Sequence, residues 1–111
     1  VERNARELLD AADGWRVVLL VVVVVVGAPI VEELVYRGLI QRAAVARVGI
    51  VAGVAGSSVF FGAIHLRPVE LPVLIVAGAV FGVLAARTDR LGPAITAHMG
   101  FNAAGLVALA W

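Results

Sequence analysis

The chain has 111 residues, enough for one domain, and 62% of them are hydrophobic while only 15% are charged. The net charge of +1 gives no support for a polyanionic partner such as a nucleic acid, and the absence of cysteine excludes disulfides, thiolate nucleophiles and cysteine-ligated zinc. With a mean hydropathy of +1.04, this apolar share exceeds that of ordinary soluble domains. The composition therefore predicts an all-α polytopic membrane protein, a transmembrane helical bundle.

The first 14 residues, VERNARELLDAADG, mix charged and apolar side chains and predict a short amphipathic helix at the membrane surface. From residue 15 onward the chain is largely apolar, and we treat residues 15–111 as one intramembrane domain. The sequence begins with Val rather than Met and has no signal-peptide pattern. We therefore expect it to be a C-terminal portion of a longer protein.

Residues 15–47 form the first apolar segment, and Pro29 lies inside it. Proline removes a backbone donor and crowds the preceding turn, so we predict one long helix kinked at Pro29. Two short helices joined at residues 27–29 are the alternative, although residues 15–28 alone are short for a span of about 20 residues. Gln41, Arg42 and Arg47 mark the predicted return to water.

Three more apolar segments follow, at residues 48–66, 73–86 and 94–111, and polar turns that contain proline separate the last two from what precedes them. Each fits one span if residues 73–86 are extended by their flanks, which gives a four-helix core. With four spans the arginines divide evenly between the two sides and the orientation stays open, whereas five spans would place the N-terminal side in the cytoplasm. Glycines spaced four apart (Gly49 with Gly53, Gly78 with Gly82) predict close helix packing within a monomer.

Six ionisable or amide side chains fall inside the apolar segments: Glu32, Glu33, Arg37, His65, His98 and Asn102. Such groups are costly in hydrocarbon, so they usually face one another or a wet cavity. Glu33 and Arg37 are four residues apart with the acid first, which is the favoured order for a helical ion pair. Glu32 points about 100° away around the helix and is free of that pair.

The same spacing of four recurs on two other segments, in Phe61 with His65 and in His98 with Asn102. Each feature has a structural explanation of its own: an ion pair needed for folding, an interfacial histidine, or an interhelical hydrogen bond. All three in one short chain favour a functional site. We expect Glu32, His65, His98 and Asn102 to line one cavity.

Three motifs in this chain carry a resemblance to a known family: EELVYR (Glu32–Arg37) fits EExxxR, FGAIH (Phe61–His65) fits FxxxH, and HMGFN (His98–Asn102) fits HxxxN. In this order on separate apolar segments, with Tyr36 before Arg37, they resemble the glutamic-type CAAX-processing and bacteriocin-processing intramembrane endopeptidases, also called the abortive-infection family. The resemblance covers about residues 15–111 and corresponds to the family's four-helix catalytic core. It implies a peptidase of CAAX-type proteins, bacteriocin precursors or other membrane-associated substrates. The Arg- and Ala-rich composition indicates a bacterial cell membrane.

The resemblance also implies a role for each matched residue. Glu32 would be the general base that activates water, with His65 assisting it. His98 and Asn102 would stabilise the oxyanion of the tetrahedral intermediate. Glu33 and Arg37 would position the site, and Phe61 would pack beside it.

Two alternatives stay open. A zinc site built from Glu32, His65 and His98 fits by residue type, and family members are often described as metalloendopeptidases. The HExxH motif is absent, however, and we expect no metal or other cofactor. The other alternative is a non-catalytic immunity factor or scaffold that keeps the polar set for folding. The partners expected for a peptidase are its peptide or membrane-protein substrate and the lipid bilayer.

Overall fold

The computed structural model describes residues 6–7, 10–11 and 13–110, and this part of the chain is almost entirely helical, without a strand. One long helix, Gly14–Val48, contains in order α2 (Gly14–Val21), η1 (Val22–Gly27), α3 (Ala28–Val35), η2 (Tyr36–Gln41) and α4 (Arg42–Val48). Three helices follow: α5 (Ile50–Ile64), α6 (Leu71–Thr88) and α7 (Gly92–Ala110). The helix that we predicted over residues 1–14 falls largely on residues outside the described part, although residues 6–7 and 10–11 are helical.

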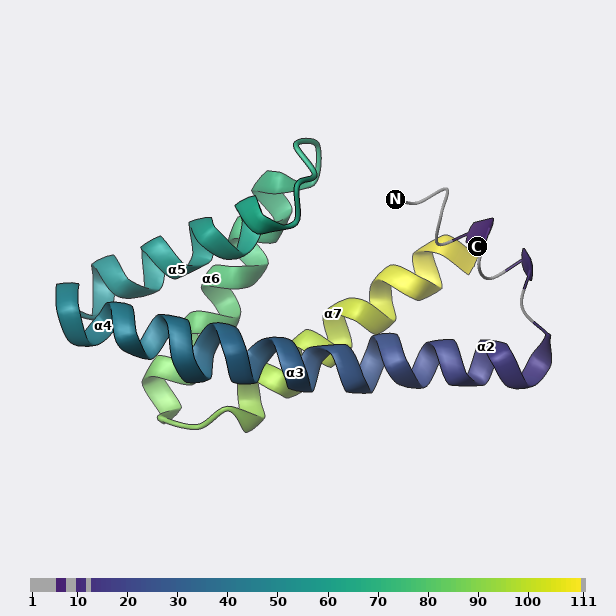
Figure 1. The fold of residues 1–111 in the computed structure, drawn as a ribbon, viewed down its shortest axis with the longest axis horizontal. Helices are drawn as coiled ribbons and strands as arrows, with labels where there is room; N and C mark the ends of the chain where they lie inside the picture. The colour runs from purple at the N-terminus through teal and green to yellow at the C-terminus, as the bar shows by residue number, and fades with distance from the viewer. Residues whose placement is uncertain (1–5, 8–9, 12, 111) are drawn as a thin grey trace.

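Figure 1 shows how these helices are arranged. The long helix runs across the whole molecule, α5 folds back over α4, and α6 crosses the half of the long helix that ends at α4. The yellow helix α7 starts beneath α3 and extends toward the α2 end. The molecule is therefore elongated, with principal extents of 47 × 27 × 18 Å.

The long helix passes through Pro29 without interruption, which confirms the single helix over two short ones. Where we predicted a kink, the helix contains a π-helical segment, η1. The residue that follows it, Ala28, donates its N–H to the Val23 carbonyl, five residues earlier. Because proline lacks an N–H and its ring crowds the preceding turn, a wider turn accommodates it. The second π-helical segment, η2, carries Arg37 and Gln41. Such segments inside α-helices are frequent at functional sites.

Gly49 makes the reversal between α4 and α5. Its φ of 87° lies in the left-handed region that glycine adopts without strain. One turn later, a Cβ on Gly53 would lie 2.6 Å from Cγ2 of Val45, so α4 and α5 can pack this closely only because Gly53 has no side chain. Helix α5 is 15 residues long, shorter than the segment 48–66 that we predicted as a span. The helix starts only after Gly49, and it ends before residue 66 because the chain turns at His65 and Leu66 lies in the left-handed region.

Much of the outer surface consists of large apolar side chains, including Trp15, Val51 and Val76, which are 66%, 81% and 62% exposed. The buried apolar core is small: Phe61, Leu74, Ala77, Phe81, Ala85 and Ala94. Within the described residues, two helices, Gly14–Val48 and Leu71–Thr88, are long and apolar enough to cross a membrane. Helices that are apolar on their outward faces suit a lipid environment. The all-α helical bundle predicted from the composition is confirmed.

Candidate active site

The centre of the molecule holds a buried ion pair between Glu33 and Arg37. Their side chains are 0% and 1% exposed, and Arg37 Nη1 donates to Glu33 Oε1 at 2.9 Å. The guanidinium carbon lies 4.6 Å from the ring centre of Phe61 and 5.5 Å from that of Phe81, so two aromatic faces also hold the cation. Arg37 Nη2 donates to the Gly78 carbonyl on α6 at 2.6 Å. The ion pair predicted from the spacing is confirmed, and it is anchored to a second helix.

His98, on α7, lies between the two adjacent glutamates. Its Nδ1 is 2.7 Å from Oε1 of Glu33, and its Nε2 is 3.1 Å from Oε2 of Glu32. Its ring stacks on Phe81 with 4.7 Å between ring centres and 14° between planes. Sequence spacing left Glu32 without a partner in its own helix, and the structure gives it a partner on another helix.

His98 joins the two glutamates through its two ring nitrogens. Arg37 Nη1 donates to Oε1 of Glu33, and Nδ1 of His98 contacts the same oxygen. At Nε2, an imidazolium would donate to Glu32, whereas an imidazole with its proton on Nδ1 would accept from the Glu32 carboxyl.

Exposure separates the two glutamates. The Glu32 side chain is 33% exposed, whereas that of Glu33 is 0% exposed. Part of the Glu32 side chain is therefore exposed while its carboxylate touches His98. Glu33 is closed off by Arg37 and His98, which both contact its Oε1.

Asn102 lies one turn beyond His98 on α7 and faces η1. Its Nδ2 donates to the Val24 carbonyl at 2.9 Å. His98 precedes Asn102 along α7, but their partners on the long helix, Glu32 and Val24, follow in the reverse order. The two helices therefore run antiparallel here. An amide nitrogen carries two N–H groups, and the second one remains for another acceptor.

His65 lies apart from this cluster. Its Nδ1 is 2.5 Å from the Phe61 carbonyl, and its ring meets the Phe61 ring edge-on with 4.7 Å between centres. Phe61 in turn contacts Tyr36 and His98, with centres 5.2 and 6.0 Å apart. Among the residues the structure describes, no hydrogen bond or ion pair joins His65 to Glu32 or His98. The structure thus brings Glu32 to His98, sets Asn102 one turn away, and relates His65 to them only through the Phe61 ring.

Two residues of the cluster were missed by the sequence reasoning. Phe81 contacts both His98 and Arg37, but nothing in the sequence distinguishes it from other apolar residues of α6. Gln41 was interpreted as a return to water, yet it is only 4% exposed and donates to the Gly82 carbonyl at 3.0 Å. A signal for Gln41 does exist, since it continues the spacing of four from Glu33 through Arg37.

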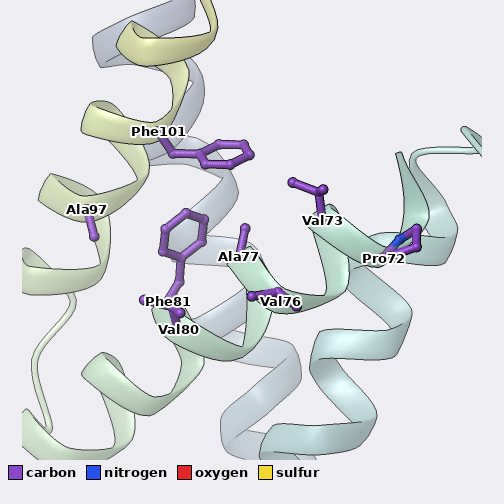
Figure 2. A pocket seen from close by; sticks show the side chains of 8 residues that line it. All are labelled: Pro72, Val73, Val76, Ala77, Val80, Phe81, Ala97 and Phe101. Atoms are coloured by element: carbon purple, nitrogen blue, oxygen red, sulfur yellow. The ribbon is translucent and has the colours of Figure 1, made fainter. Parts of the chain in front are cut away.

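A groove of about 500 Å³ runs between α6 and α7, and Phe81, whose ring stacks on His98, is one of the residues that line it. Figure 2 shows the rings of Phe81 and Phe101 beside one another in it, with centres 6.0 Å apart. Its lining is wholly apolar: Pro72, Val73, Val76, Ala77, Val80, Phe81, Ala97 and Phe101. An apolar side chain or a hydrocarbon chain could occupy this groove.

The three residues of the alternative zinc set, Glu32, His65 and His98, do not converge on one point in this arrangement. Both ring nitrogens of His98 face carboxylates, and Nδ1 of His65 faces the Phe61 carbonyl. Within residues 6–7, 10–11 and 13–110, no three His, Cys, Asp or Glu side chains are grouped so that they could hold a metal ion.

Comparison with known proteins agrees with the geometry. The profile of the family described as "Type II CAAX prenyl endopeptidase Rce1-like" matches residues 14–104, a range that contains every residue of the cluster. The chain is 31% identical over 99 residues to a Bacillus subtilis (strain 168) protein named "Putative membrane peptidase YdiL". That match covers 89% of this chain and 40% of YdiL, so the chain spans less than half of that relative's length. No solved structure gives a significant match.

Proposed function

Since this chain belongs to the type II CAAX prenyl endopeptidase Rce1-like family, we propose that it is the catalytic part of an intramembrane endopeptidase. Its substrates would be membrane-associated proteins or peptides, cleaved in the bacterial cell membrane. The observation that carries the proposal is the continuous set of contacts Arg37–Glu33–His98–Glu32, which ends at a carboxylate that is one-third exposed.

Glu32 is the proposed general base. Its carboxylate takes a proton from a water molecule while the water oxygen attacks the scissile carbonyl carbon, and the carbonyl oxygen becomes an oxyanion. The protonated Glu32 then gives that proton to the amide nitrogen as the C–N bond breaks. The products are a carboxylic acid and an amine, and Glu32 returns to its initial state.

His98 and Asn102 are the proposed oxyanion donors. In the resting structure Nε2 of His98 faces Glu32. Once Glu32 has taken the proton from water, it attracts the Nε2–H group less strongly, and that group is free to donate to the oxyanion. Asn102 keeps one N–H on Val24 and offers the other, so its side chain is already oriented when charge develops.

Glu33 and Arg37 are proposed as the support that orients His98, and the aromatic side chains of Phe61 and Phe81 exclude water from that side. The proposed assistance of His65 to Glu32 requires its ring to turn away from the Phe61 carbonyl. We propose a reaction without a metal or other cofactor, because the described contacts of His65 and His98 do not bring both rings and Glu32 to one point.

The experiment is a cleavage assay with the protein reconstituted in liposomes. A farnesylated CAAX peptide and a leader-bearing bacteriocin precursor are incubated with the wild-type protein and with Glu32→Gln, and products are identified by mass spectrometry. We expect at least one substrate to be cut at a defined bond by the wild type alone. Equal cleavage by the variant, or a folded wild type that cuts neither substrate, would leave the non-catalytic alternative as the better explanation.

A further inference from the structure

Gln41 is a buried polar residue for which the proposed reaction has no use. It lies one turn beyond Arg37 on the same face of the long helix, in the π-helical segment η2. Its Nε2 donates to the Gly82 carbonyl at 3.0 Å, and Arg37 Nη2 donates to the Gly78 carbonyl at 2.6 Å. Donor and acceptor are 41 residues apart in both hydrogen bonds. One turn along the long helix, from Arg37 to Gln41, therefore corresponds to one turn along α6.

The two glycines of α6 make these contacts available. A Cβ on Gly82 would lie 2.5 Å from Oε1 of Gln41, and a Cβ on Gly78 would lie 3.2 Å from Nη2 of Arg37. A side chain on a helix covers the backbone of the turn before it, so the missing side chain of Gly82 also leaves the Gly78 carbonyl uncovered. Gly78 and Gly82 thus form a pair of acceptor sites that receive Arg37 and Gln41 in one register.

Folding stability alone does not require glutamine at this position. Its Oε1 is buried and has no hydrogen-bond partner among the described residues. An orphaned buried acceptor is unfavourable, so an apolar side chain of the same length would fill the space without that cost. What such a side chain would lose is the directional contact from Nε2 to α6.

We propose that Gln41 is a positioning residue of the active site, which holds the long helix in register on α6 so that Arg37 keeps Glu33, and through it His98, in place. The inference rests on the proposed function for its kinetic consequence only. The chain of contacts runs from Gly82 through Gln41 and the next turn of the helix to Arg37, then through Glu33 to Nδ1 of His98.

Gln41→Met tests this role, because methionine matches glutamine in length and lacks both its donor and its acceptor. We expect kcat to fall by about ten- to a hundredfold, since small displacements of catalytic groups have effects of this size. KM and the melting temperature should change little, because the side chain of Gln41 is directed at α6 and the orphaned acceptor is removed. Unchanged kcat, or a fall in kcat that merely follows a fall in folded protein, would overturn the proposal.

Ser58→Ala is the matched control. Ser58 is also buried, and its hydroxyl donates to a backbone carbonyl, that of Val54, at 2.7 Å. That hydrogen bond stays within α5 and joins no two helices. We expect Ser58→Ala to affect stability about as much as Gln41→Met does and to leave kcat unchanged. A fall in kcat equal to that of Gln41→Met would show that any lost buried hydrogen bond suffices.

A second measurement does not depend on activity. The chain has two histidines, so nitrogen-15 labelling of histidine gives ring signals for His65 and His98 alone. We expect Gln41→Met to shift the His98 ring signals and to leave those of His65, whose Nδ1 is on Phe61, in place. Unmoved His98 signals would refute the positioning role even if kcat fell. If the wild type cleaves no substrate, the proposed function fails, and this spectrum still decides whether Gln41 positions His98.

Discussion

Two neighbouring faces of α3, that of Glu33 and that of Glu32, lie in different surroundings. Glu33 is fully buried and contacts Arg37 and His98, and Arg37 is fixed in turn to α6. Glu32 is one-third exposed, and among the residues that the structure describes its carboxylate pairs with His98, at 3.1 Å. Two identical side chains one residue apart thus occupy opposite environments, because a rotation of about 100° carries one into the bundle and the other to its accessible edge.

The comparison shows how a membrane helix can carry both support and chemistry. A carboxylate that must keep its charge in hydrocarbon needs fixed partners, and a carboxylate that must exchange a proton needs access to water. His98 contacts both, so it links the fixed carboxylate to the accessible one. Substitutions on either face test this difference between the two glutamates.

The largest effect is expected on the accessible face. Glu32→Gln keeps the shape of the side chain but removes the base, so turnover should fall by about a hundredfold to ten-thousandfold. Folded yield in detergent and melting temperature should stay near those of the wild type, because the Glu32 side chain is partly exposed and glutamine can keep a hydrogen bond to His98. Cleavage rate and yield are measured together. Glu33→Gln is the matched change, and it should lower both; the reverse outcome would mean that base and support are assigned the wrong way round.

On the fixed face, Arg37→Leu leaves the Glu33 carboxyl buried without its cation. Breaking a buried ion pair by removing one partner costs about 3–5 kcal/mol, so folded yield and melting temperature should fall together with activity. Unfolding in detergent measures the loss. Arg42→Leu is the control, because Arg42 pairs with Asp89 at 3.2 Å on the exposed surface, where a pair contributes little. Equal losses for the two variants would contradict a special role for the buried pair.

Spacing within a single helix was enough to predict part of this site. Glu33 and Arg37 meet because residues four apart share a helix face, and the same rule places His98 and Asn102 together on α7. The four helices also followed from apolar runs and the turns between them, with α5 predicted too long. Gly49 and the His65–Leu66 turn shorten that helix, and a hydropathy pattern does not show where a backbone turns.

Contacts between helices could not be predicted in the same way. That His98 touches both glutamates depends on how α7 crosses the long helix, and that His65 touches the Phe61 carbonyl depends on where α5 ends. Gln41 was misread for a related reason. A polar residue beside two arginines at the end of an apolar run suggests water, and only the glycines of α6 make it a buried contact.

A smaller loss is expected from Asn102→Ala, on the accessible side of the cluster. Removing one oxyanion donor costs on the order of a hundredfold in kcat, and the contact to Val24 is lost with it. KM should change less than kcat, because the donor acts when charge develops. Thr96→Ala serves as the control. Thr96 is also on α7 and also donates to a backbone carbonyl, but its acceptor is Gly92 of the same helix, at 2.9 Å. A kcat equal to that of the wild type would remove Asn102 from the reaction.

The smallest effect is expected from chelators, and it tests the same comparison from the side of His98. If a metal were the electrophile, Nε2 of His98 and a ring nitrogen of His65 would bind it together with Glu32, while Nδ1 of His98 could keep its contact with Glu33. In the structure Nε2 of His98 is instead 3.1 Å from Glu32 itself, and Nδ1 of His65 faces the Phe61 carbonyl. We therefore expect cleavage in detergent to persist at its full rate in EDTA or phenanthroline. Loss of activity that zinc restores, while magnesium does not, would make Glu32, His65 and His98 metal ligands and would end the distinction between a fixed and a proton-exchanging glutamate.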